Sequence, residues 1–134
     1  MNIVVLDKGC LPEGAEFPFL EAPKYGWVER LQVAEEEMAE VAWRAHILVT
    51  VNTPVRAAVI DQLPLLKMVV IMKDCADNSC DLVDMEAANA REIQVAHVPD
   101  GAIDGVENST ASCAEVVRII DAMIVGKPTN LLFR

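Results

Sequence analysis

Short apolar runs rich in β-branched residues recur along the chain, and segments with helical periodicity separate them. Such runs suit strands that are buried on both faces of a parallel sheet, because neither face needs polar residues. Four runs have this character, and a more polar segment is predicted as a further strand. The predicted strands are residues 2–6 (NIVVL), 26–32 (GWVERLQ), 46–51 (HILVTV), 66–72 (LKMVVIM) and 93–98 (IQVAHV).

Helices are predicted between the strands. Residues 34–44 (AEEEMAEVAWR) carry three glutamates in the first turn, where the helix dipole favours anions, and an apolar face behind them. Residues 12–24 contain three prolines without clear periodicity, which predicts a loop with at most one short helix. The other predicted helices are residues 55–63 (VRAAVIDQL), 81–92 (DLVDMEAANARE) and 112–125 (SCAEVVRIIDAMIV).

The alternation of strand and helix predicts right-handed crossovers and a parallel sheet covered on both faces. The 134 residues suit one domain, residues 1–134, with residues 126–134 as a C-terminal tail. Ligands of such sheets bind beyond the carboxyl ends of the strands. The loops of interest are therefore residues 7–12, 52–54 and 73–81, and the segment that starts at His97.

Charge and composition exclude several classes of function. A formal net charge of −10 argues against nucleic acid or an anionic membrane as a partner, since either needs a basic face. The N-terminus, MNIVVLDKG, lacks the features of a secretory signal, and no apolar stretch is long enough for a membrane span. We expect a soluble, cytoplasmic protein in which Cys10, Cys75, Cys80 and Cys113 are reduced thiols without a CxxC pair.

Several segments, taken in order, resemble the substrate domain of the D-isomer-specific 2-hydroxyacid dehydrogenases, and the glycerate or hydroxypyruvate reductase branch is the most similar. The resemblance covers residues 2–124 and rests on the order and spacing of the segments. It implies a flavodoxin-like three-layer α/β sandwich, with a parallel sheet of about five strands and helices on both faces. The segments are NIVVLD, HILVTVNTPVRAAVIDQLPLLKMV, VDMEAANAREIQVAHVP and SCAEVVRIIDAMI.

In this family the substrate domain is joined to a Rossmann domain that binds NAD(H) or NADP(H). The 134 residues contain no GxGxxG fingerprint, and the catalytic Arg, Glu and His of the family belong to the part that is not matched here. No catalytic or cofactor-binding residue is therefore assigned. We expect no cofactor and no dehydrogenase activity in this chain alone, with NAD(P) entering only if a separate Rossmann domain partners it.

The loop KDCADNSCD, which begins at Lys73 and ends at Asp81, departs from the family pattern. The family has a short glycine-containing turn here, whose N–H groups approach the substrate carboxylate, whereas this loop is longer and has no glycine. Its three aspartates would repel a carboxylate unless a cation intervened. A Ca²⁺ or Mg²⁺ site, a Zn²⁺ site of Cys75, Cys80 and His97, and a Cys75–Cys80 disulfide are alternatives, but the spacing favours a solvated acidic loop without metal.

The second rim of the expected cleft is also altered. Residues 100–111 form an insertion, His97 stands where the family usually has Asn, and Glu92 stands where it usually has Gly. We interpret His97 as a satisfied histidine rather than a general base. The predicted ligand-binding residues, facing a possible small carboxylate, are Asn52, Thr53, Cys75, Ala76, Asp77, Asn78 and His97.

The segment that begins at Ser112 and ends at Val125 is apolar around most of its circumference, which predicts burial on more than one side. We expect this helix and the LLFR tail to be covered in a homodimer or by a partner subunit. In the alternative, the helix folds back onto its own sheet.

Three functions follow from the sequence. The preferred one is a stand-alone, non-catalytic module, derived from the dehydrogenase substrate domain, for small-molecule binding or subunit interaction. The alternative is a fragment or split subunit of an NAD-dependent D-2-hydroxyacid dehydrogenase, and the third is a structural protein without a ligand.

Overall fold

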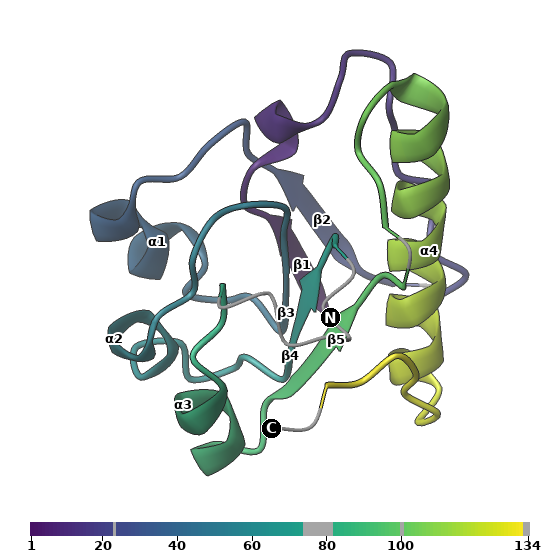
Figure 1. The fold of residues 1–134 in the computed structure, drawn as a ribbon. Helices are drawn as coiled ribbons and strands as arrows, with labels where there is room; N and C mark the ends of the chain where they lie inside the picture. Colours follow the sequence, from purple (N-terminus) through teal and green to yellow (C-terminus); the bar gives the residue numbers. More distant parts are fainter. Residues whose placement is uncertain (23, 74–81, 100, 133–134) are drawn as a thin grey trace.

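A single sheet of five parallel strands, in the order β2-β1-β3-β4-β5, forms the centre of the molecule (Figure 1). The computed structural model describes residues 1–22, 24–73, 82–99 and 101–132. All five predicted strands are confirmed, each somewhat shorter than its sequence pattern. They are β1 (Asn2–Val5), β2 (Gly26–Glu29), β3 (Ile47–Thr50), β4 (Met68–Ile71) and β5 (Gln94–His97).

Helices cover both faces of the sheet and complete a three-layer, flavodoxin-like α/β fold, as predicted. Three short helices lie on one face and one long helix lies on the other (Figure 1). A turn of 3₁₀ helix, η1 (Lys8–Cys10), follows β1. The α-helices are α1 (Glu35–Val41), α2 (Ala57–Ile60), α3 (Met85–Ala90) and α4 (Val106–Ile124).

The pleat of the strands explains why they are apolar throughout. Alternate residues of a strand point to opposite faces, so a sheet that is covered twice must be apolar at every position. Ile3 and Val5 of β1 join the core beneath α4, while Val4 joins the core beneath α1, α2 and α3. The same alternation holds in β3 and β4, whose residues are all buried.

Helix α4 packs its apolar side against the sheet of its own chain. Cys113, Val116 and Ile120 are fully buried in the core on this face. The helix begins at Val106 rather than at Ser112, so half of the predicted insertion is helical. The structure thus shows the alternative in which the helix folds back onto its own sheet, while a homodimer or partner subunit on the remaining surface of this helix stays a prediction.

The C-terminal tail adds a short antiparallel segment to the outer edge of β5. The His97 N–H donates to the Asn130 carbonyl at 3.0 Å, and the Leu132 N–H donates to the Val95 carbonyl at 2.7 Å. Leu131 packs into the core on one face of the sheet and Leu132 into the core on the other. The tail therefore satisfies backbone groups that would otherwise form an open sheet edge.

Glu92 ends α3 in a left-handed conformation, with φ of 58°. Its N–H donates to the Asn89 carbonyl, and the N–H of Ile93 donates to the Ala88 carbonyl, which is the Schellman pattern of a helix C-terminus. Glycine adopts this conformation without steric cost. The family usually has glycine at this position, and in this chain a glutamate adopts the backbone conformation that glycine would adopt.

Replacing Glu92 by glycine should stabilise the protein. Left-handed backbone costs a non-glycine residue roughly 1–2 kcal/mol, and the greater freedom of glycine in the unfolded chain offsets roughly 0.5–1 kcal/mol of this. We expect Glu92→Gly to raise the free energy of unfolding in urea by about 0.5–1 kcal/mol. Glu92→Ala is the matched control, because it removes the same charge but keeps the strain; equal stability of the two variants would contradict the interpretation.

Candidate functional site

The carboxyl edge of the sheet is where the fold predicts a ligand, at the point where the strand order reverses between β1 and β3. Asp7 follows β1 at this point and is only 2% exposed. Its Oδ1 accepts a hydrogen bond from the Val51 N–H at 2.8 Å. Its Oδ2 accepts from the N–H of Asn52 at 2.7 Å, from the N–H of Thr53 at 3.0 Å and from Thr53 Oγ1 at 2.8 Å.

Asp7 therefore occupies a row of backbone donors that would otherwise suit an external anion. Successive N–H groups in a turn form a concave site of this kind. Thr50 supports the turn, because its Oγ1 accepts from the Thr53 N–H at 2.9 Å and donates to the Thr53 carbonyl at 2.7 Å. A ligand carboxylate at this edge must consequently find other donors.

Asn52 and Lys73, from the segments that follow β3 and β4, influence Cys10, the last residue of η1, at the same edge. The Cys10 thiol donates to Asp7 Oδ2 at 3.7 Å. Burial and the negative charge of Asp7 raise the pKa of Cys10, whereas a hydrogen bond from the Asn52 side chain and the charge of Lys73 act in the opposite direction. Because the rise prevails, Cys10 is a protonated hydrogen-bond donor at neutral pH.

His97 also lies at the carboxyl edge, but at the end of β5, which is the outermost strand of the sheet. It is the last residue of β5 and is 7% exposed. Thr50 is in register with Ile71, which is in register with His97, so two strand spacings, roughly 10 Å, separate Thr50 from His97. The structure brings the predicted residues Asn52, Thr53 and His97 to one edge without joining them.

The remaining predicted ligand-binding residues lie outside the described part of the chain. They are Cys75, Ala76, Asp77 and Asn78. Among the residues that are described, no three His, Cys, Asp or Glu side chains are grouped so that they could hold a metal ion. No helix in the described ranges has the length and apolar character needed to span a bilayer.

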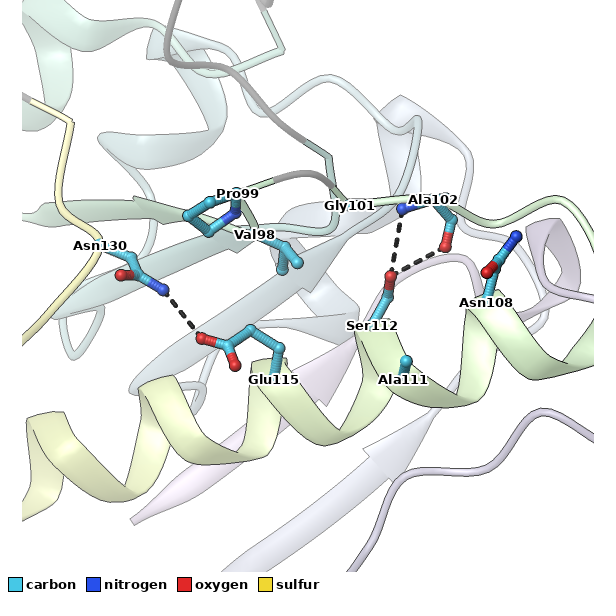
Figure 2. A pocket seen from close by; sticks show the side chains of 9 residues that line it. All are labelled: Val98, Pro99, Gly101, Ala102, Asn108, Ala111, Ser112, Glu115 and Asn130. Atoms are coloured by element: carbon cyan, nitrogen blue, oxygen red, sulfur yellow. Dashed lines mark hydrogen bonds between the residues drawn. The ribbon is translucent and has the colours of Figure 1, made fainter.

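A cavity of about 390 Å³ opens between the end of β5, the link that follows it and α4 (Figure 2). Ser112 holds the link to the helix, since its Oγ donates to the Ala102 carbonyl at 2.8 Å and accepts from the Ala102 N–H at 3.3 Å. The cavity is polar as well as apolar. Its lining includes Val98, Ala102, Asn108, Ser112, Glu115 and Asn130.

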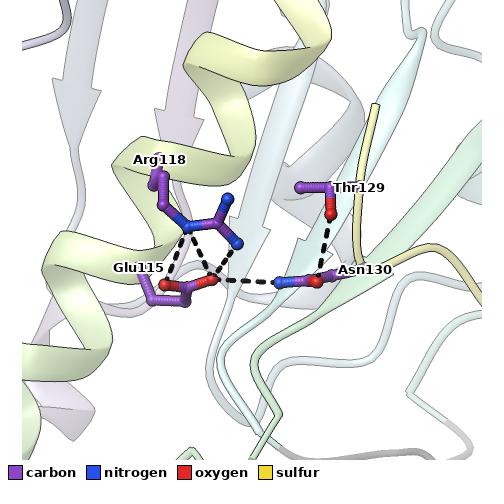
Figure 3. A network of polar contacts seen from close by, with 4 residues as sticks. All are labelled: Glu115, Arg118, Thr129 and Asn130. Carbon is purple, nitrogen blue, oxygen red and sulfur yellow. Dashed lines mark hydrogen bonds and ion pairs between the residues drawn. The ribbon is translucent and has the colours of Figure 1, made fainter. Parts of the chain in front are cut away.

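Glu115 is the charged group of this cavity and the centre of a polar network (Figure 3). Arg118 donates to its carboxylate from Nε at 3.0 Å and also from Nη2, and Asn130 Nδ2 donates at 3.0 Å. The hydrogen bond from Arg118 is the main cause that lowers the pKa of Glu115. The network joins α4 to the tail and keeps a negative charge at the cavity wall.

The sequence predicts the carboxyl edge and its loops at residues 7–12 and 52–54, but it does not predict the side chains that hold these segments together. Asp7 was placed in a loop of interest, yet nothing local indicates that it binds amides some 44 to 46 residues away. Glu115 and Arg118 lie in the segment that the sequence predicts as a mostly apolar helix, and Asn130 lies in the predicted tail. The three-residue spacing of Glu115 and Arg118 was the available signal for their ion pair.

The sequence matches the model of one protein family over most of its length. The family is described as D-isomer specific 2-hydroxyacid dehydrogenase, catalytic domain, and the match covers residues 4–130. No curated protein matches the sequence.

Solved structures with a similar fold include three enzymes. They are a 3-phosphoglycerate dehydrogenase from Entamoeba histolytica with bound NAD⁺ (20% identity, TM-score 0.57), the D-lactate dehydrogenase from Escherichia coli (20%, 0.53) and an acyclic imino acid reductase in complex with NADPH and D-Arg (19%, 0.55). Each comparison covers 74% of this chain and, in the same order, 33%, 31% and 31% of the other chain. The chain thus spans about a third of the length of these enzymes, and at this identity the likeness shows the fold alone.

Replacing Asp7 by asparagine should strongly destabilise the protein. The substitution removes the negative charge and turns an NH₂ group toward backbone N–H donors. We expect the free energy of unfolding in urea to fall by about 2–4 kcal/mol. Thr53→Val is the matched comparison, because it removes one neutral donor and should cost about 1 kcal/mol; equal losses in both variants would contradict a central role for Asp7.

Replacing Lys73 by methionine should raise the pKa of Cys10 further, because the ammonium group that favours the thiolate is removed. The measurement is the rate of alkylation of Cys10 by iodoacetamide against pH, followed by peptide mass spectrometry. We expect the Lys73→Met curve to move to higher pH. Lys67→Met, at the opposite end of β4, is the control and should leave the curve unchanged. An equal shift in both variants would contradict a specific effect of Lys73 on Cys10.

Proposed function

The chain belongs to the catalytic-domain family of the D-isomer specific 2-hydroxyacid dehydrogenases, and we propose that it is a stand-alone module that binds a small carboxylate without catalysing its conversion. The proposed site is the carboxyl edge of the sheet. The ligand class is a 2-hydroxy or 2-oxo acid, as the family suggests.

The observation that carries the proposal is the position of Lys73, two residues after the end of β4. Its positive charge acts on the Cys10 thiol, at the edge where ligands of this fold bind. In a chain with a net charge of −10, an anion needs such a local cation to approach. The neighbouring Asp7 carboxylate is already surrounded by hydrogen-bond donors, which reduces its repulsion of a ligand.

Two groups at this edge are poorly suited to proton or group transfer. The Cys10 thiol stays protonated because its pKa is raised, and a thiol is a weak nucleophile compared with a thiolate. The Asp7 carboxylate accepts four hydrogen bonds from residues 51–53, so both of its oxygens are occupied by groups of its own chain. These features support a binding role over a catalytic one.

A second candidate function is a catalytic-domain part of an NAD-dependent dehydrogenase that a separate Rossmann domain completes. The observation in its favour is that the chain aligns with about a third of a dehydrogenase that binds NAD⁺. This candidate predicts NAD(H)-dependent reduction of hydroxypyruvate or glyoxylate once such a domain is supplied.

A thermal-shift and calorimetric comparison of lactate with lactamide tests the preferred function. The two molecules differ in the carboxylate, so only lactate should stabilise the fold, by about 2.7 kcal/mol when its concentration is 100 times its Kd. Lys73→Met should abolish the effect, Lys73→Arg should retain it, and Lys67→Met should leave it unchanged.

Equal effects of lactate and lactamide, or full binding by Lys73→Met, would contradict the proposed site. Other 2-hydroxy and 2-oxo acids are screened in the same way, with sodium chloride at equal ionic strength as the control. Saturable binding of NAD(H) by the chain alone would favour the dehydrogenase instead.

A further inference from the structure

Four of the six aromatic residues of the chain line a single cavity of about 540 Å³ at the edge strand β2. These residues are Phe17, Phe19, Tyr25 and Trp27. The cavity shares no lining residue with the carboxyl-edge site or with the cavity beside α4. Neither the family nor the proposed function gives it a role.

The pleat of β2 and the loop that precedes it build this aromatic wall. Tyr25, Trp27 and Glu29 occupy alternate positions, so they point to one face of the sheet. Trp27 is in register with Ile3 of β1, whose side chain lies in the core beneath α4. Phe17 comes from the loop, and its ring centroid lies 5.3 Å from that of Trp27, with the planes tilted by 57°.

The polar atoms of Trp27 and Tyr25 each take part in a hydrogen bond. Trp27 Nε1 donates to Glu29 Oε2 at 2.8 Å, and Tyr25 Oη accepts from the Leu20 N–H at 3.2 Å. Contact of the indole N–H with a carboxylate makes the ring more electron-rich, which strengthens its attraction for a cation. The faces of the rings are therefore the main surface that they offer to a ligand.

Two carboxylates, those of Glu16 and Glu29, complete the lining. Their charge opposes an anionic ligand and gives no advantage to a neutral apolar one. Glu29 is engaged by Trp27, and Glu16 lies 3.8 Å from the ammonium of Lys8. The carboxylates can thus balance a positive charge but are poorly placed to receive the paired donors of a guanidinium group.

Phe19 is the most unusual member of the set, because 92% of its surface is exposed. Burial of a phenylalanine ring is favourable, so a ring left in water beside an aromatic cavity is available to close over a ligand.

From this geometry we propose that the aromatic cavity binds a small organic cation of the quaternary ammonium type. The four rings contact the alkyl groups and attract the charge by cation–π interactions, and Glu16 and Glu29 neutralise it. A quaternary ammonium ion has no N–H to donate, so aromatic faces together with nearby carboxylates are sufficient to bind it.

Fluorescence of Trp27 in a Trp43→Phe background tests this proposal, since that variant leaves a single tryptophan. The probes are choline and its neutral isostere 3,3-dimethylbutan-1-ol. We expect choline to give a saturable change and the isostere to bind at least about five-fold more weakly. Equal binding of the two probes would overturn the proposal, because it would mean that the cavity recognises shape and not charge.

Substitutions at the cavity separate specific binding from a general effect of salt. Phe19→Leu should weaken choline binding about five-fold, and Phe19→Tyr should retain it, since tyrosine keeps the ring. Phe19 is exposed, so far-UV circular dichroism should show both variants folded. Leu65→Ala, at an exposed position that is not part of the cavity lining, is the control. An unchanged affinity of Phe19→Leu, or a response that sodium chloride reproduces, would overturn the proposal.

Discussion

The hydrogen bonds of Asp7 fix the point on which the rest of the carboxyl edge depends. They join the end of β1 to the turn after β3, at the place where the chain changes direction across the sheet. Charged acceptors with several N–H donors are among the stronger interactions in a folded protein. Because the turn is held in this way, Asn52 is presented toward Cys10, and the amides that could bind a ligand anion are already taken. The same interaction that orders the edge therefore moves any anion site outward, toward Lys73.

The opposite side of the sheet is completed by the chain itself. Helix α4 buries its apolar side on the sheet, and the tail covers the edge of β5 with Leu131 and Leu132 on opposite faces. Glu115 links these two elements through Asn130. Within the described residues, α4 and the tail thus cover this side of the sheet and its outer edge.

Local patterns explain what the sequence predicted well. β-branched runs buried on both faces specify their strands within the run itself, so all five strands and the long helix were found, and only their ends differ. The position of Glu92 was identified by resemblance, and its left-handed backbone is what a glycine position would show. In contrast, the contacts of Asp7 and of Leu131 are with residues far away in the sequence. The spacing of apolar residues within a segment does not indicate such contacts. The aromatic cavity was missed for the same reason, since it needs Phe17 and Trp27 together.

The net charge of −10 acts in opposite directions on the two proposed sites. The field of an acidic protein repels a carboxylate on its way to Lys73, so that binding there depends on short-range contacts with the lysine and Asn52. The same field attracts an organic cation to the aromatic cavity, where Glu16 and Glu29 add a local contribution. At ordinary ionic strength, salt largely screens interactions between exposed charges that lie more than about 8–10 Å apart, so it weakens the long-range part of both effects. Added salt should therefore reduce the penalty at the carboxyl edge and reduce the attraction at β2, so the two sites are distinguishable by the sign of their salt dependence.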